Sequence, residues 1–209
     1  MVAQFFTIGI LMLFSAMLPG PDFAMVTKNT LIHSRRSGLF TSLGVGTAIL
    51  VHITYCALGL AVVISKSILL FSFIKYLGAG YLIYIGVSAL LSKQSDHIAM
   101  TGQHLKKSEI SNWLSFRQGF LCNLLNPKAT LFFMALFTVI IKPETPVLWL
   151  VIYAAEMFVI LTAWFCCLTM ILSHPRVTRI LGKAEKFIAK ATGVFLIGFG
   201  AALAFVKNE

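Results

Sequence analysis

The chain has 209 residues, of which 58% are hydrophobic and only 11% are charged, and its formal net charge is +10. Soluble domains carry roughly 25% charged residues, so the composition excludes an ordinary soluble domain and indicates an integral membrane protein. The positive charge does not indicate a nucleic-acid-binding protein, because the basic residues lie in short gaps between apolar runs, where they set membrane orientation.

Six apolar runs are each long enough for a membrane helix, since about 20 apolar residues cross the hydrocarbon. They predict a single all-α integral membrane domain over residues 1–209, with one sizeable polar loop, residues 92–113. The expected spans, in chain order, are residues 2–27, 38–64, 68–91, 114–141, 147–172 and 187–206.

The basic residues are divided unevenly between the two sides of the predicted membrane. Thirteen of the seventeen Lys and Arg residues lie in or beside the first, third and fifth gaps, and four lie on the other side. Cytoplasmic loops carry the excess of basic residues. We therefore expect the odd-numbered gaps in the cytoplasm and both termini on the opposite side of the membrane.

The first and fourth predicted spans each contain a proline break. One break runs from Pro19 to Asp22 and the other from Asn126 to Lys128. Proline removes a backbone donor and clashes one turn earlier, so a helix kinks or breaks there. Hydrocarbon tolerates the freed backbone groups only where they face protein or a water-filled cavity. Paired breaks of this kind are typical of the substrate sites of transporters.

Because three spans separate the two breaks, the second half of the chain would run in the opposite direction to the first. The sequence thus predicts six transmembrane helices as two inverted three-helix repeats, residues 2–91 and 114–206, with proline-broken first helices. The two breaks then supply the candidate substrate-binding residues, which are Pro21, Asp22, Asn126, Pro127 and Lys128.

Each of these side chains has a structural and a functional interpretation. Asp22 would cap the second half-helix or contact the ammonium group of an amino acid. Pro127 fits the first position of a new helix, with Asn126 as its N-cap. Lys128 would pair with Asp22, meet a substrate carboxylate, or extend to the lipid headgroups.

Candidate proton-coupling groups lie deeper in the predicted spans. Glu156 is about nine residues into the fifth span, or ~13 Å deep at ~1.5 Å per residue. A carboxylate at that depth is costly and should face the bundle interior, as a proton carrier or as a hydrogen-bonded packing residue. His52 is a second candidate, although lone histidines often only link helices. Asp22 is the third.

No cofactor and no bound metal are expected. All four cysteines lie inside apolar runs without C-x-x-C spacing, which is typical of buried free thiols. An enzyme using Cys166 and Cys167 is disfavoured, because adjacent helical residues point in different directions. A divalent-cation exporter remains the alternative function, although such sites require clustered oxygen or imidazole ligands.

The motifs together resemble the LysE/RhtB family of amino-acid exporters over nearly the whole chain. The stretches that carry the resemblance are Pro19 to Phe23, Ser37 to Gly46, Tyr76 to Gly86, Phe116 to Ala129 and Gly193 to Gly200. The resemblance implies a bacterial inner-membrane protein that exports amino acids, driven by the proton gradient. With the orientation from the basic residues, both termini would be periplasmic, and the inverted repeat leads us to expect alternating access by proton antiport.

Within that family the chain most resembles the branch that handles neutral amino acids such as threonine and homoserine, so the resemblance implies a cargo of that type. The charges within the spans agree with a zwitterionic cargo. A cationic cargo would require an excess of buried carboxylates, whereas the spans hold two acids, Asp22 and Glu156, against Lys75 and Lys128. The expected partners are thus the amino acid, protons and the lipid bilayer, and no nucleic acid. The sequence leaves open whether the protein forms a homo-oligomer.

Overall fold

The computed structural model describes residues 1–66, 110–141 and 145–174, together with isolated positions within 76–91 and 190–201. This part of the chain contains helices and their connections, and no strand. The third and sixth predicted spans, 68–91 and 187–206, and nearly all of the predicted polar loop lie outside the described residues. The inverted repeat therefore remains a prediction, of which the first two spans of each half can be inspected.

The first predicted span is broken into two helices, α1 (Val2–Met17) and α2 (Pro21–Lys28). The axis bends by 60° between them. Leu18 has an extended backbone, with ψ of 127°, as expected for a residue that precedes proline. Pro21 is the first residue of α2, a position where its missing N–H has no intrahelical partner to lose.

A π-helical turn, η1 (Asn29–His33), connects α2 to α3 (Arg35–Lys66). At ~1.5 Å per residue, the 32 residues of α3 span ~48 Å, which exceeds the ~30 Å hydrocarbon core. The helix therefore extends beyond the predicted span of 38–64 at both ends.

The fourth predicted span is also broken, into α5 (Asn112–Leu124) and α6 (Pro127–Ile140), with a bend of 57°. The helix begins two residues earlier than predicted, because Ser111 caps it by accepting a hydrogen bond from the Leu114 amide at 3.1 Å. The last long helix, α7 (Val147–Leu172), has the predicted bounds.

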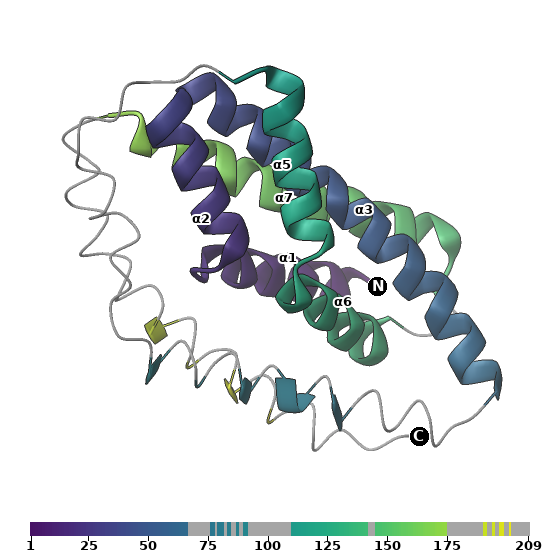
Figure 1. Cartoon of the computed structure of the whole chain (residues 1–209). Coiled ribbons are helices and arrows are strands. Elements are labelled where there is room, and N and C mark those ends of the chain that lie inside the picture. Colours follow the sequence, from purple (N-terminus) through teal and green to yellow (C-terminus); the bar gives the residue numbers. More distant parts are fainter. Residues whose placement is uncertain are drawn as a thin grey trace.

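Figure 1 shows α2 and α5 on one side of the two breaks and α1 and α6 on the other, with the long helices α3 and α7 running past both. Helices α3 and α7 are each long and apolar enough to cross a membrane, and each bent pair also passes this test when it is counted as one span. The described part of the chain is thus that of an all-helical membrane protein.

Two glycines allow α3 and α5 to touch along their backbones. A Cβ atom at Gly44 would lie 2.1 Å from the Phe116 carbonyl oxygen, and one at Gly119 would lie 2.1 Å from the Thr41 carbonyl oxygen. No side chain fits at either position. Small residues of this kind are typical of close helix contacts in membranes, where shape complementarity replaces the hydrophobic effect. This contact holds the α5 side of the second break against α3.

Candidate functional site

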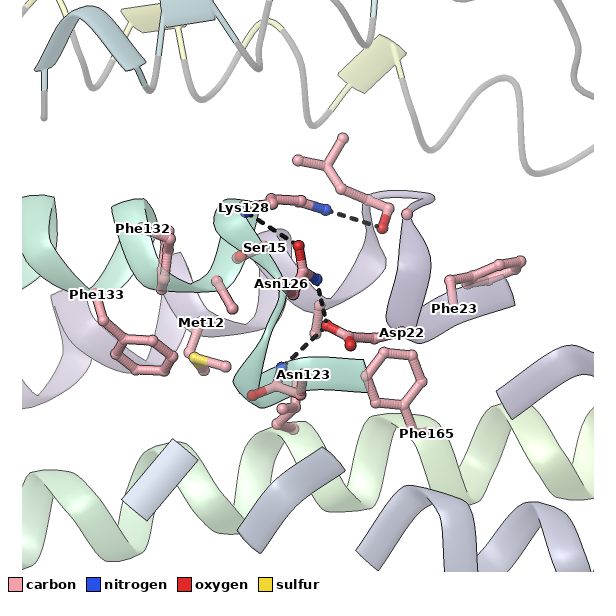
Figure 2. A pocket seen from close by; sticks show the side chains of 15 residues that line it. Met12, Ser15, Asp22, Phe23, Asn123, Asn126, Lys128, Phe132, Phe133 and Phe165 are labelled. Carbon is pink, nitrogen blue, oxygen red and sulfur yellow. Dashed lines mark hydrogen bonds between the residues drawn. The ribbon is translucent and has the colours of Figure 1, made fainter. Parts of the chain in front are cut away.

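A small cavity of about 30 Å³ lies where the two helix breaks meet (Figure 2). That volume has room for about one or two water molecules, so in this conformation the cavity is too contracted for an amino acid. Its polar lining comes almost entirely from the breaks, and its apolar lining comes mainly from α1, α6 and α7. The polar side chains are Ser15, Asp22, Asn123, Asn126 and Lys128, and the large apolar ones include Met12, Phe132, Phe133, Leu161 and Phe165.

Asp22 connects the two halves of the chain. Its Oδ2 accepts hydrogen bonds from Nδ2 of Asn123 and from Nδ2 of Asn126, each at 3.0 Å. The predicted role of Asp22 as a helix cap is wrong, because the N-cap of α2 is Gly20 and no side chain caps that helix. The second oxygen, Oδ1, is buried without a hydrogen-bond partner, as is Oδ1 of Asn123. Two residues that line the cavity therefore each have one acceptor without a hydrogen-bond partner.

Asn126 and Pro127 occupy the predicted positions. Asn126 is the N-cap of α6, and its Oδ1 accepts from the Lys128 amide at 3.0 Å, while Pro127 is the first helical residue. Asn126 therefore has two separate tasks: its oxygen caps its own helix and its nitrogen binds Asp22.

Lys128 reaches the opposite break and does not extend toward the lipid headgroups. Its Nζ donates to the Leu18 carbonyl at 3.2 Å, at the point where α1 ends. Among the described residues it forms no ion pair, with Asp22 or with any other acid. An ammonium group has three donors, so the bond to Leu18 leaves two for another acceptor. A Cβ at Gly20 would lie 3.3 Å from Nζ, so the glycine leaves room for this approach.

Helices α1 and α6 are antiparallel and cap each other. While Lys128, at the start of α6, binds the carbonyl at the end of α1, Gln4 near the start of α1 donates to the carbonyl of Ile140, the last residue of α6, at 2.6 Å. Carbonyls at helix ends lack intrahelical partners and cannot be left bare in a membrane. Each half of the chain therefore satisfies a helix end of the other half.

His52 lies beside the cavity but does not line it. It is fully buried on α3, and its ring is stacked on Phe133 with centroids 5.2 Å apart. Its Nε2 donates to the Asn123 carbonyl at 3.2 Å, and its Nδ1 is hydrogen-bonded to the Tyr55 hydroxyl. The structure therefore connects His52 to the backbone of the residue that binds Asp22, and not to Asp22 itself.

Glu156 lies outside the cavity, on the α7 turn that precedes Leu161. It packs against α1, since a Cβ at Gly9 would lie 2.4 Å from its Oε1. Its Oε2 is buried without a hydrogen-bond partner. The structure thus brings Asp22, Asn126 and Lys128 together with their prolines, and leaves Glu156 and His52 as neighbours of this cluster.

Two polar residues that line the cavity, Asn123 and Ser15, were not identified as site residues from the sequence. Asn123 precedes Asn126 by three positions, a spacing that places both on one face of a helix. That spacing was the available signal. Ser15 lies in an apolar run, where nothing distinguishes it from a helix-packing serine. In the described part of the chain, no three His, Cys, Asp or Glu side chains lie close enough together to hold a metal ion.

Comparison with known proteins confirms the resemblance seen in the sequence. The model of the LysE type translocator family matches residues 13–206. The chain is 35% identical over 188 residues to the uncharacterized membrane protein YrhP of Bacillus subtilis, which covers 88% of this chain and 90% of that protein. It is 30% identical to the leucine efflux protein of Salmonella typhimurium, covering 94% and 92% of the two chains. It is 29% identical to the threonine efflux protein of Escherichia coli, covering 96% and 97%. No solved structure matches. The chain is therefore a member of the LysE type translocator family.

Proposed function

We propose that this protein is a secondary exporter that moves neutral amino acids out of the bacterial cytoplasm across the inner membrane. The observation that carries the proposal is the meeting of Asp22, Asn123, Asn126 and Lys128 at one cavity between two broken helices. The relatives named as threonine and leucine efflux proteins support amino acids as the cargo. Both of those amino acids are neutral.

The ammonium group of the cargo would bind at Asp22. Oδ1 of Asp22 and Oδ1 of Asn123 are buried acceptors without a hydrogen-bond partner, and an ammonium supplies three donors. A hydrogen bond to a charged group is worth about 1.5–3 kcal/mol, which is the gain expected when the cargo satisfies the buried carboxylate. Binding would thus supply hydrogen bonds to the one oxygen of the Asp22 carboxylate that has no partner among the described residues.

The carboxylate of the cargo would bind at the start of α6. Amides in the first turn of a helix have no intrahelical acceptor, and the helix dipole favours an anion there. Ala129 lies in this turn and lines the cavity. The two remaining donors of the Lys128 ammonium, which also lines the cavity, would complete the anion site.

The remaining wall would contact the cargo side chain. It is formed mainly by Met12, Phe132, Leu161 and Phe165, and Ser15 contributes a hydroxyl (Figure 2). The apolar residues of this wall suit the side chain of leucine, and the Ser15 hydroxyl can hydrogen-bond the hydroxyl of threonine or homoserine. A cationic side chain would find no acid in this wall. A neutral, zwitterionic cargo therefore fits best.

Glu156 would couple transport to the proton gradient. Its unpartnered Oε2 is buried, and a charged carboxylate without a partner is costly in such a place. Proton uptake by the Glu156 carboxylate removes its negative charge. Because Glu156 packs against Gly9 of α1, the helix that ends at the first break, a change in its charge can move the site. Proton entry from the periplasm would then accompany release of the cargo.

Alternating access in the proposed inverted repeat completes the mechanism. With both termini in the periplasm, α2 and α5 would form the cytoplasmic half of the site and α1 and α6 the periplasmic half. The contracted cavity is what we expect of a state between the two openings. The alternative of a divalent-cation exporter gains no support from the described residues.

The test is efflux of labelled leucine, threonine and lysine from proteoliposomes with an imposed pH gradient. We expect gradient-driven efflux of leucine and threonine and little of lysine. Asp22→Asn should abolish transport of every cargo, whereas Glu156→Gln should abolish gradient-driven efflux but retain exchange of internal for external amino acid. Thr54→Val is the matched control, because among the described residues the Thr54 hydroxyl binds only the Leu50 carbonyl of its own helix. Full proton-dependent efflux in both variants would refute the assigned roles.

A further inference from the structure

We propose that two small hydrogen-bonded clusters are the gates of the transport path. The inner gate is Asn29 with Thr41 and Gln118, and the outer gate is Gln4 with Tyr153 and the Ile140 carbonyl. The inference rests on the proposed function, because gates have meaning only in a protein that opens to each side in turn. It names the residues that would open each side of the protein, which the proposed function leaves unassigned.

Asn29 joins three helical elements at the inner gate. It is the first residue of η1, and its Nδ2 donates to Thr41 Oγ1 on α3 and to Gln118 Oε1 on α5, each at 2.8 Å. Asn29 and Thr41 are fully buried. Both amide hydrogens are therefore used in bonds that hold α2 and η1 against two other helices.

The inner gate is built so that it can open. Oδ1 of Asn29 and Oγ1 of Thr27 are buried without hydrogen-bond partners, so closure leaves polar groups unsatisfied that water would satisfy after opening. Asn29 also begins a π-helical turn, a feature that is frequent at functional sites. The closed gate is thus held by two hydrogen bonds, but it leaves two buried polar atoms without hydrogen-bond partners, which favours opening.

Helix α2 links this gate to the site. Asp22 is in its first turn and Asn29 directly follows its last residue, so the two lie ~10.5 Å apart at ~1.5 Å per residue. A cargo that binds and shifts Asp22 must move the same short helix that leads directly into Asn29. Occupation of the site and release of the inner gate are mechanically connected.

The outer gate lies on the other side of the cavity. Gln4 Nε2 donates to the Ile140 carbonyl at 2.6 Å, and the Tyr153 hydroxyl lies 3.2 Å from Gln4 Oε1. These bonds join α1, α6 and α7 at the end of the molecule remote from α2. Tyr153 is 1% exposed, so its hydroxyl depends on protein partners.

Helix α7 shows that the two gates flank the site. Tyr153 precedes the cavity-lining Leu161 by eight residues, and Thr169 follows it by eight, which corresponds to ~12 Å in each direction. The Thr169 hydroxyl accepts from Thr30 at 3.4 Å, next to Asn29. The two clusters therefore lie on opposite sides of the cavity along α7, which is where the gates of an alternating-access transporter would lie.

The experiment measures access to the cavity from each side. A Ser15→Cys reporter is placed in a background in which the four native cysteines are replaced by serine. A membrane-impermeant cationic thiol reagent is applied to intact cells, which exposes the periplasmic face, and to inverted vesicles, which expose the cytoplasmic face. Asn29→Ala and Gln118→Met should raise the labelling rate about 10-fold in inverted vesicles, while Tyr153→Phe should do so in intact cells.

Matched variants separate gating from misfolding. Gln118→Glu keeps an acceptor for Asn29 and should label like the reporter alone, as should Thr54→Val. Equal labelling of the inner-gate and outer-gate variants from one side, or no change in any of the three, overturns the proposal. If the wild-type protein, with Ser15 and its native cysteines, exports no amino acid in proteoliposomes while the gate variants still open to opposite sides, the assignment of amino acids as cargo fails and the gates stand.

Discussion

Asp22 and Asn126 lie 104 positions apart in the sequence, and the side-chain amide of Asn126 donates to the carboxylate of Asp22 over 3.0 Å. Each residue belongs to a proline break, so this bond joins the two discontinuities of the fold at a single point. The freed backbone and side-chain groups of both breaks thereby face one another, which is the only arrangement that a membrane tolerates apart from a water-filled cavity.

Substitution of Asn126 should separate its two tasks. Asn126→Asp keeps the oxygen that caps α6 but removes the donor to Asp22 and places a second carboxylate beside it, so we expect folded protein with transport reduced at least about 10-fold. Asn126→Ala also loses the cap, at a cost of about 1 kcal/mol in stability. Thermal unfolding in detergent and proteoliposome efflux distinguish the two effects. Normal transport by Asn126→Asp would contradict this account.

Removal of the Lys128 ammonium should affect both a helix end and the cargo. Lys128→Met retains the apolar stem but leaves the Leu18 carbonyl without its partner and removes the charge facing the cargo carboxylate. We expect a loss of affinity for amino acids of about 10–100-fold, in keeping with a charged hydrogen bond. Lys128→Arg is the informative control, because it keeps the charge but changes the donor geometry. Equal affinity in Lys128→Met and the wild type would exclude a direct role.

Substitution of His52 tests whether it positions the site or carries protons. His52→Gln keeps a donor for the Asn123 carbonyl, whereas His52→Leu does not. If His52 positions Asn123, the glutamine variant should retain cargo affinity and the leucine variant should lose about 5–10-fold. The pH-gradient dependence of export should be unchanged in the glutamine variant. Loss of that dependence would show that the histidine takes part in proton transfer.

A methyl group at Gly9 should act through Glu156. The added Cβ of Gly9→Ala would lie 2.4 Å from Oε1 of Glu156, so the carboxyl group must move. We expect a changed coupling ratio, measured as amino acid exported per proton taken up, with the site affinity retained. Gly59→Ala is the matched control, because its Cβ would meet no described atom within 4 Å. Unchanged coupling in Gly9→Ala would contradict the proposed role of Glu156 in proton coupling.

A methyl group at Gly44 should destabilise the fold itself. Its Cβ would lie 2.1 Å from the Phe116 carbonyl, which is backbone and cannot rotate away. Forcing α3 and α5 apart should cost about 1–3 kcal/mol, typical of an overpacked core. The measurement is the fraction of monodisperse protein after heating in detergent, again with Gly59→Ala for comparison. Equal thermal stability of the two variants would show that this helix contact is not required.

Local chemistry in the sequence determined where the helices break and end. Pro21 and Pro127 begin new helices, Asn126 caps one of them, and α7 has the predicted bounds, because these features depend on a proline ring, a nearby side-chain oxygen or a run of apolar residues. The same motifs were sufficient to recognise the family.

Only the tertiary structure decided which groups those breaks bind. Helix capping was one of the two roles considered for Asp22, yet its carboxylate binds asparagines from the other half of the chain. Lys128 was considered as a partner of Asp22, yet it binds the Leu18 carbonyl. The physical reason is that a side chain's choice among several polar partners depends on how two distant helices pack, and no local pattern records that packing.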